Sequence, residues 1–124
     1  MTMRKAARRG VFAVVAVLSL DAAAIAQSTA LGDGAYACRE WTTERKTNST
    51  RSKMSSTWLL GFLSGVNATP TDPPRDILSG VNIDDLIAFV DRFCCENPSA
   101  NVGTAASKLA EELRIRAREK KPSS

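Results

Sequence analysis

The chain has 124 residues, which is the length of one small domain, and 44% of them are hydrophobic. It contains no histidine, which excludes Ser-His-Asp and Cys-His catalytic sites and removes the commonest transition-metal ligand. The net charge is +4, but most of the excess lies in the first 26 residues, so it is poor evidence for a basic nucleic-acid-binding domain.

Those first 26 residues have the three parts of a secretory signal peptide. Four basic residues lie within 4–9, the run VFAVVAVLSL is apolar but short for a membrane span, and Ala24-Ile25-Ala26 matches the pattern that signal peptidase reads. We therefore expect cleavage after Ala26 and export to the periplasm. Asp21 is unusual so late in the apolar run, and an uncleaved membrane anchor is the alternative. In an oxidising compartment, cysteines are read first as a disulfide framework.

The first part of the exported chain predicts two helices. Residues 27–34 are small and polar and are expected to form a disordered lead-in. A helical domain then begins at residue 35, with a short helix over 35–46 and a polar loop that ends at an N-cap, Ser55 or Ser56. The second helix extends to about residue 67, and its apolar face comprises Trp58, Leu59, Phe62, Leu63 and Val66.

Two glycines interrupt this second helix. Gly61 and Gly65 are four residues apart and lie on one stripe, and each costs up to about 1 kcal/mol relative to alanine inside a helix. Their spacing indicates that another backbone of the same domain packs closely there. The connection that follows contains Pro70, Pro73 and Pro74 and is expected to be a semi-rigid loop. Its aspartates lack the spacing of a calcium-binding loop, so no metal site is expected.

The third helix decides which cysteine faces the interior. It is expected to begin after Asn82, and its apolar stripe comprises Ile83, Leu86, Ile87, Val90, Phe93 and Cys94. Cys95 falls on the other side of the helix. The helical phase therefore selects Cys94 as the disulfide partner of Cys38 and leaves Cys95 as a free thiol, either exposed and able to crosslink a dimer or shielded beneath the 97–101 turn.

The last helix is expected to begin at Ser99 or Val102, after Asn97-Pro98, and to end near Arg118. Its narrow apolar stripe comprises Val102, Ala105, Ala106, Leu109, Leu113 and Ala117. The cations near its end complement the negative end of the helix, and residues 119–124 form a basic and polar tail. The fold class is therefore all-α, a small bundle of about four helices pinned by one disulfide, with the helical domain over 35–118.

Three segments together resemble a group of small exported proteins of Gram-negative bacteria. They are Cys38-Arg39-Glu40-Trp41, WLLGFLSGVN at 58–67 and IDDLIAFVDRFCCENP at 83–98. More distantly, they are similar to the HdeA/HdeB family of periplasmic acid-stress chaperones and to periplasmic amidase-immunity proteins. The resemblance implies a helical domain in which Cys38 and Cys94 form the disulfide and Asn97-Pro98 starts a helix. The third cysteine and the basic tail depart from the pattern.

The resemblance and the missing chemistry together imply a protein that is not an enzyme and has no cofactor, no catalytic residues and no bound metal. The first hypothesis is a chaperone-like or stress-related protein, in which acid exposes a client surface that includes Trp58, Phe62 and Val66. The alternative is an immunity or inhibitor protein that binds one protein partner through a loop near the proline-rich connection. Neither hypothesis involves nucleic acid or stable membrane insertion after cleavage, and both leave room for a homodimer.

Overall fold

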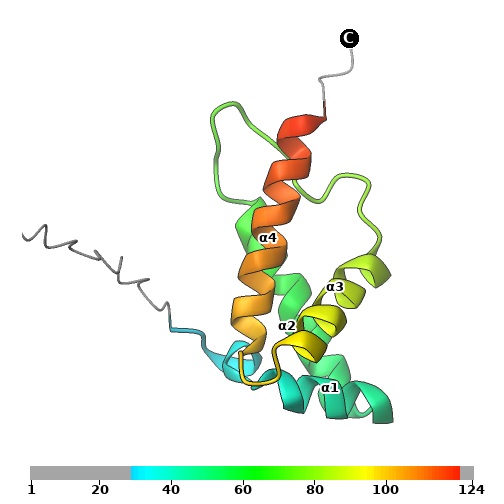
Figure 1. The fold of residues 1–124 in the computed structure, drawn as a ribbon. Helices are drawn as coiled ribbons and strands as arrows, with labels where there is room; N and C mark the ends of the chain where they lie inside the picture. The colour runs from blue at the N-terminus through cyan, green and yellow to red at the C-terminus, as the bar shows by residue number, and fades with distance from the viewer. Residues whose placement is uncertain (1–28, 121–124) are drawn as a thin grey trace, which may run out of the picture.

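Four α-helices and one short 3-10 helix make up the part of the chain that a computed structural model describes, residues 29–120 (Figure 1). The elements are η1 (Gly32–Ala35), α1 (Cys38–Thr47), α2 (Thr50–Asn67), α3 (Ile83–Glu96) and α4 (Val102–Glu119). No strand occurs among these residues. The predicted all-α bundle of about four helices with one disulfide is confirmed. The signal peptide, with its cleavage site, and residues 121–124 lie outside the described residues.

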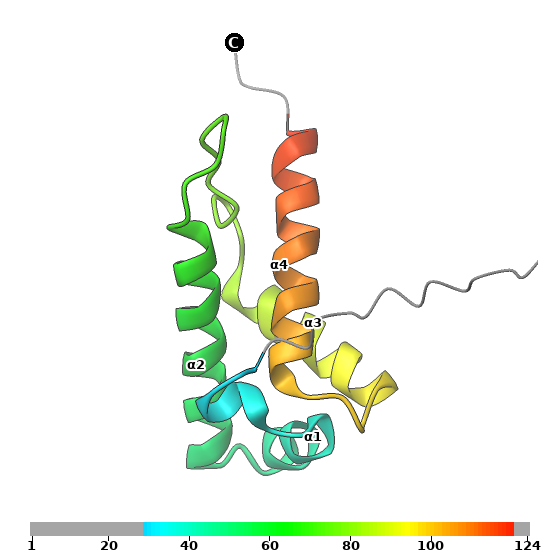
Figure 2. The same ribbon diagram turned by 90° about the vertical axis from the view of Figure 1, so that its left-hand side faces the viewer.

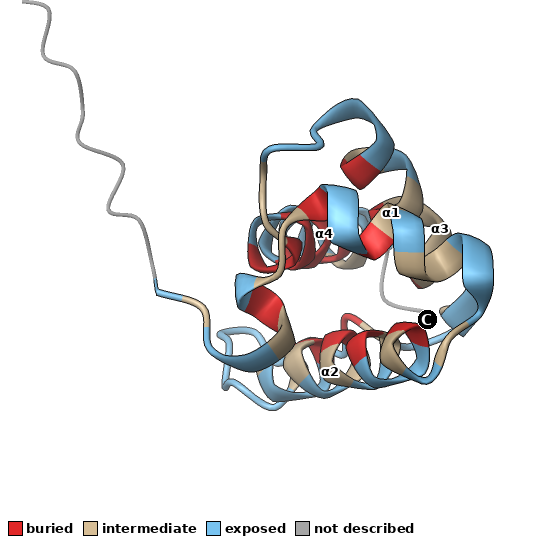
Figure 3. Ribbon diagram, turned by 90° about the horizontal axis from the view of Figure 1, so that it is seen from below, coloured by how far each residue is buried: buried red, intermediate tan, exposed pale blue. Residues whose placement is uncertain are grey.

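The long helices α2 and α4 rise from the same end of the molecule, with α1 lying across that end (Figures 1 and 2). From α2 the chain returns through the 68–82 connection into α3, which descends toward α1. Viewed from below, the buried residues of these helices face one another across the middle of the bundle (Figure 3). The largest fully buried side chains are Trp41, Leu59, Leu63, Leu113, Val90, Val102, Cys38 and Cys94.

The disulfide joins α1 to the last turn of α3, as the helical phase predicted. Cys38 and Cys94 are bonded and are 0% and 1% exposed, whereas Cys95 is exposed and free. The shielded alternative for Cys95 is therefore wrong. Two backbone hydrogen bonds reinforce this junction, since the amides of Cys38 and Arg39 donate to the carbonyls of Ala100 (2.8 Å) and Pro98 (3.1 Å).

The loop predicted between the first two helices is mostly helical. Asn48 has a positive φ of 46° and ends α1, and the Ser49 hydroxyl then accepts from the Ser52 amide at 3.1 Å and caps α2. The predicted caps, Ser55 and Ser56, lie inside the helix. The polar residues of this first turn and a half gave no apolar periodicity, which is why the sequence did not show it.

Three further expectations differ from the structure. Residues 32–34 belong to the helix η1 and are not a loose lead-in, because Gly34 is buried against α2. Nothing lies within 4 Å of a Cβ placed at Gly61 or Gly65, so the predicted close packing of another backbone there is wrong. Ile83 starts the α3 stripe but is 53% exposed, because it lies at the first turn of the helix, beyond the packed part of the bundle.

Candidate functional site

The outer part of α2 carries an aromatic pair. The rings of Trp58 and Phe62 are stacked with their centroids 5.5 Å apart, and both side chains are half-buried. Val66 follows one turn later and packs against the core cluster. The three residues predicted as a client or partner surface therefore lie along one helix, with Trp58 and Phe62 in direct contact. We call Trp58, Phe62 and Val66 the aromatic face.

The helix η1 covers the tryptophan of this face. A Cβ placed at Gly34 would lie 2.3 Å from Cζ2 of Trp58, and one at Gly32 would lie 3.7 Å from the same indole. Only a glycine lets the η1 backbone lie so close to the ring at position 34. Gly32 also has a φ of +62°, which glycine adopts without strain. Trp58 is thus half-buried because a four-residue segment lies on it.

One carboxylate fastens this cover to α2. Asp33 accepts a hydrogen bond from the Ser55 hydroxyl at 2.9 Å and forms an ion pair with Arg51 at 3.5 Å. The Arg51 guanidinium in turn lies 3.8 Å from the centroid of the Tyr36 ring, at the end of η1. Ser55 is only 4% exposed, so its hydroxyl needs this partner. We call Asp33, Arg51, Tyr36 and Ser55 the clasp.

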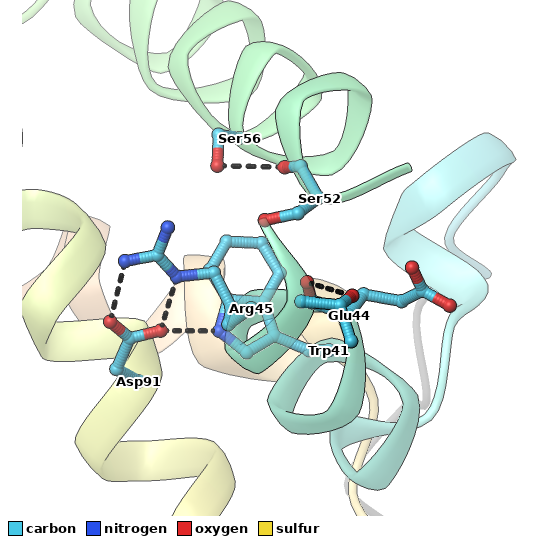
Figure 4. A network of polar contacts seen from close by, with 7 residues as sticks. Trp41, Glu44, Arg45, Ser52, Ser56 and Asp91 are labelled. Atoms are coloured by element: carbon cyan, nitrogen blue, oxygen red, sulfur yellow. Dashed lines mark hydrogen bonds and ion pairs between the residues drawn. The ribbon is translucent and has the colours of Figure 1, made fainter. Parts of the chain in front are cut away.

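A second carboxylate joins α1 to α3 (Figure 4). Asp91 accepts from Nε1 of the buried Trp41 at 2.8 Å and from Nε and Nη2 of Arg45 at 2.9 and 3.0 Å. The hydrogen bonding of Arg45 to Asp91 raises the pKa of Arg45 above its ordinary value, and burial of the guanidinium opposes this effect. The arrangement orients Trp41 within the core and ties the two disulfide-linked helices together a second time.

The solvent side of α2 carries no charge over more than three turns. From Thr57 to the end of the helix, its exposed residues are small or polar, namely Thr57, Gly61, Ser64 and Gly65. Open space surrounds both glycines. An uncharged surface of low relief beside a half-covered aromatic pair suits contact with another polypeptide more than chemistry on a small substrate.

A concave groove lies on another side of the bundle, between α3, α4 and the segment 76–82. It has a volume of about 410 Å³, and its floor includes Leu86, Phe89, Leu109 and Leu113. Charged residues of both signs stand around it, namely Asp76, Asp85, Arg92, Arg116 and Lys120. The groove has no nucleophile paired with a base.

Within residues 29–120 there is no group of three or more histidine, cysteine or acidic residues placed to hold a metal ion. The same residues contain no helix with both the length and the apolar character needed to cross a bilayer. Cys95 lies on the exposed side of α3, one residue from the disulfide, and takes no part in it.

The sequence placed Trp58, Phe62 and Val66 together on one helix, as the structure has them, but it did not show the residues that cover and fasten them. Asp33 lay in a segment interpreted as a lead-in, and Arg51 and Ser55 lay in one interpreted as a loop. The only available signal was the pair of glycines around Asp33, because an acidic residue between two glycines suits a tight, closely packed turn.

No protein-family model, curated protein or solved structure matches the chain. The resemblance to the HdeA/HdeB family therefore stays a prediction that depends on the three motif segments.

Proposed function

We propose that this protein is exported, has no catalytic activity and binds other polypeptides through the aromatic face of α2, as a chaperone-like protein of the acid-stress type. The observation that carries the proposal is the clasp. One carboxylate, Asp33, ties the short segment that covers Trp58 to α2, and the neighbouring solvent side of α2 is uncharged.

Acid acts on this arrangement through charge. At about pH 2 carboxylates are protonated, so Asp33 loses its ion pair with Arg51, while the arginine keeps its positive charge. The charged group that pairs with Asp33 among the described residues is Arg51 from α2, whose guanidinium lies over the uncharged ring of Tyr36. With the ion pair lost, the tie between Asp33 and α2 is reduced to the hydrogen bond with Ser55. On the α4 side, the Val102 amide still donates to the Tyr36 carbonyl at 2.9 Å, at the end of η1. Its release uncovers Trp58 beside Phe62 and creates an apolar surface for unfolded clients.

The disulfide keeps the rest of the bundle together during this release. Cys38 lies three residues after the end of η1 and stays bonded to Cys94 in acid, so α1 and α3 remain joined when the clasp opens. The same acid weakens the Asp91 contacts with Trp41 and Arg45, which loosens α1 without separating it. The uncovered protein is thus a partly opened bundle and not an unfolded chain.

The proposal is tested by light scattering from an acid-sensitive client protein at pH 2 and at pH 7. Wild type should suppress aggregation at pH 2 only. Phe62→Ser should lose most of the suppression, whereas Ile115→Ser, which removes a 41% exposed apolar side chain from α4, should keep it. Asp33→Asn should shift the onset of suppression to a higher pH. Absence of suppression by wild type at pH 2 contradicts the proposal.

A second candidate function, an inhibitor or immunity protein with one partner, is favoured by a different observation. Residues 68–74 are all exposed, yet the segment is fastened on both sides. Asn67 accepts from the Ile77 amide at 2.8 Å, and Arg75 donates to the Ala117 carbonyl at 3.0 Å. A loop held at its base in this way is organised in advance for insertion into a partner's cleft.

A pull-down from exported proteins separates the two functions. A dedicated inhibitor should recover one partner in a one-to-one complex at neutral pH. Replacement of 70–74 by Gly and Ser should abolish this recovery, whereas Phe62→Ser should not. Recovery of many proteins only after acid treatment supports the chaperone-like function, and absence of any single partner at neutral pH counts against the inhibitor.

A further inference from the structure

The groove between α3 and α4 has two charged side chains that pair with no other residue of the described chain. Three of its five charged residues have partners within the described chain. Asp76 accepts from Asn67 and from the Leu78 amide. Arg116 pairs with Glu112, and Lys120 donates to the Ser79 carbonyl. Asp85 and Arg92 are exposed and form no ion pair or side-chain hydrogen bond within residues 29–120.

These two residues stand on one face of α3 with an aromatic ring between them. Asp85 and Arg92 are seven residues apart, so they lie two turns and about 10 Å apart along the helix axis. Phe89 lies between them, is half-buried and lines the same groove. From the start of α3 to its end, this face therefore carries an acidic residue, an aromatic ring and a basic residue, in that order.

Such an order is complementary to itself when reversed. If a second α3 lies antiparallel on the first, Asp85 faces the partner's Arg92 and Arg92 faces the partner's Asp85. The two Phe89 rings then meet near the two-fold axis. An interface of this kind uses the same patch on both copies, which is the commonest symmetry of soluble oligomers. A helix of an unrelated protein would pair with this face only if it happened to carry the same order of charges.

We propose that the α3–α4 groove binds a second copy of this chain, with the two α3 helices antiparallel and joined by two Asp85–Arg92 ion pairs. This surface is distinct from the aromatic face, so the dimer leaves α2 and the 68–74 loop free for the proposed functions. The proposal stands or falls without them. Because the floor residues Leu109 and Leu113 are already 3% and 2% exposed, little apolar surface remains to be buried, and the dimer should be weak and salt-sensitive.

Sedimentation equilibrium at pH 7 and low salt tests the proposal, with Cys95→Ser as the background to exclude crosslinking. The background protein should show a reversible monomer–dimer equilibrium. Asp85→Arg and Arg92→Asp each place like charges opposite one another and should weaken the dimer by at least about tenfold. The double variant restores opposite charges and should dimerise about as well as the background. Matched controls are Asp84→Arg and Arg114→Asp, which make the same charge changes outside the groove.

A protein that stays monomeric up to about millimolar concentration overturns the proposal, because two ion pairs and an aromatic contact should give a dissociation constant of about millimolar or lower. So does a dimer that the two single reversals leave unchanged, or one that the double reversal does not restore. Far-UV circular dichroism and thermal unfolding of every variant show whether a lost dimer reflects a lost fold. If a single variant is unfolded, Asp85→Asn and Arg92→Gln replace it, with a smaller expected loss of dimer.

Discussion

The two ends of the bundle are joined by different kinds of bond. At the end where α1 crosses the long helices, which we call the base, a disulfide, backbone hydrogen bonds and the Asp91 contacts hold residues 36–45 to residues 91–102. At the upper end, hydrogen bonds join the 68–82 connection to the helices. Asn67 bonds to Ile77 and Asp76, Arg75 to Ala117, and Lys120 to Ser79. The base is therefore held by a covalent crosslink, whereas the upper end is held by noncovalent contacts alone.

This difference divides the molecule by expected stability. Segments held by few exposed hydrogen bonds open locally at low free-energy cost, whereas crosslinked and buried segments open only when the whole domain unfolds. The helix η1 lies beside the base, and its tie to α2 resembles the upper end, because it depends on noncovalent side-chain contacts at Asp33. In the proposed mechanism η1 opens in acid and closes again, and it is attached to the base, which stays in place.

The largest effect is expected from removing the crosslink at the base. The disulfide closes a loop between cysteines 56 residues apart, and the chain-entropy model assigns such a loop about 4 kcal/mol. Cys38→Ser should therefore lower the free energy of unfolding, measured in urea, by about 4 kcal/mol. Cys95→Ser is the matched control and should change it by less than about 0.5 kcal/mol, since that side chain is exposed. Equal losses for the two variants would contradict the pairing.

The next largest effect should come from the second tie at the base. Asp91→Ala leaves the Trp41 indole N–H, which is buried in the core, without an acceptor and should cost about 2 kcal/mol of unfolding free energy. Asp91→Asn keeps an acceptor for Trp41 but loses the ion pair with Arg45, which is about one-third exposed. Because solvent screens that pair, its loss should cost about 1 kcal/mol or less. If the two variants unfold alike, Trp41 does not depend on Asp91.

A pair of glycine substitutions tests the cover. Gly34→Ala puts a methyl group against Trp58 and should destabilise the protein by about 1–2 kcal/mol, with a change in tryptophan fluorescence. Gly61→Ala adds the same methyl group where there is open space inside α2 and should stabilise it by about 0.5–1 kcal/mol. Opposite signs in thermal unfolding support the packing of η1 on Trp58. Stabilisation by both variants would show that η1 does not lie there.

The smallest effect is expected at the upper end. Asn67→Ala removes the acceptor of the Ile77 amide and the donor to Asp76, and should cost about 1 kcal/mol or less. The loss should be local, so hydrogen exchange should become faster in residues 68–80 while the amides of α3 keep their protection. A global loss as large as that of Cys38→Ser would mean that the upper end is as important to stability as the base.

The two C-terminal helices could be predicted from their apolar spacing. In α4, Val102, Ala105, Ala106, Leu109 and Leu113 are all buried as expected, and in α3 the phase separated Cys94 from Cys95. Periodicity works there because apolar side chains alone fill the contact between helices. The Asn82 cap also lies where predicted, with its side chain accepting from the Asp84 amide at 2.8 Å.

The start of α2 and the contacts of η1 could not be predicted in the same way, because the buried residues in the first turns of α2 are polar. Ser52 and Ser55 are 2% and 4% exposed and face the interior of the bundle, and small hydroxyl residues give no apolar stripe. Asp33 acquires its role only through contacts with residues 18 and 22 positions later, which no local pattern contains. The glycines of α2 misled the interpretation, since their spacing is the same whether a neighbouring backbone is present or absent.

Hydrogen exchange detected by mass spectrometry, at pH 7 and at about pH 2, measures directly whether the clasp opens in acid. After correction for the intrinsic pH dependence of exchange, residues 30–36 and the exposed side of α2 near Trp58 should lose protection in acid. α3 and residues 98–102 should keep theirs because the disulfide holds this end of the bundle together. Asp33→Asn should show part of this loss already at pH 7. Protection of residues 30–36 that is unchanged at about pH 2 would contradict the account, since the clasp would then not open in acid.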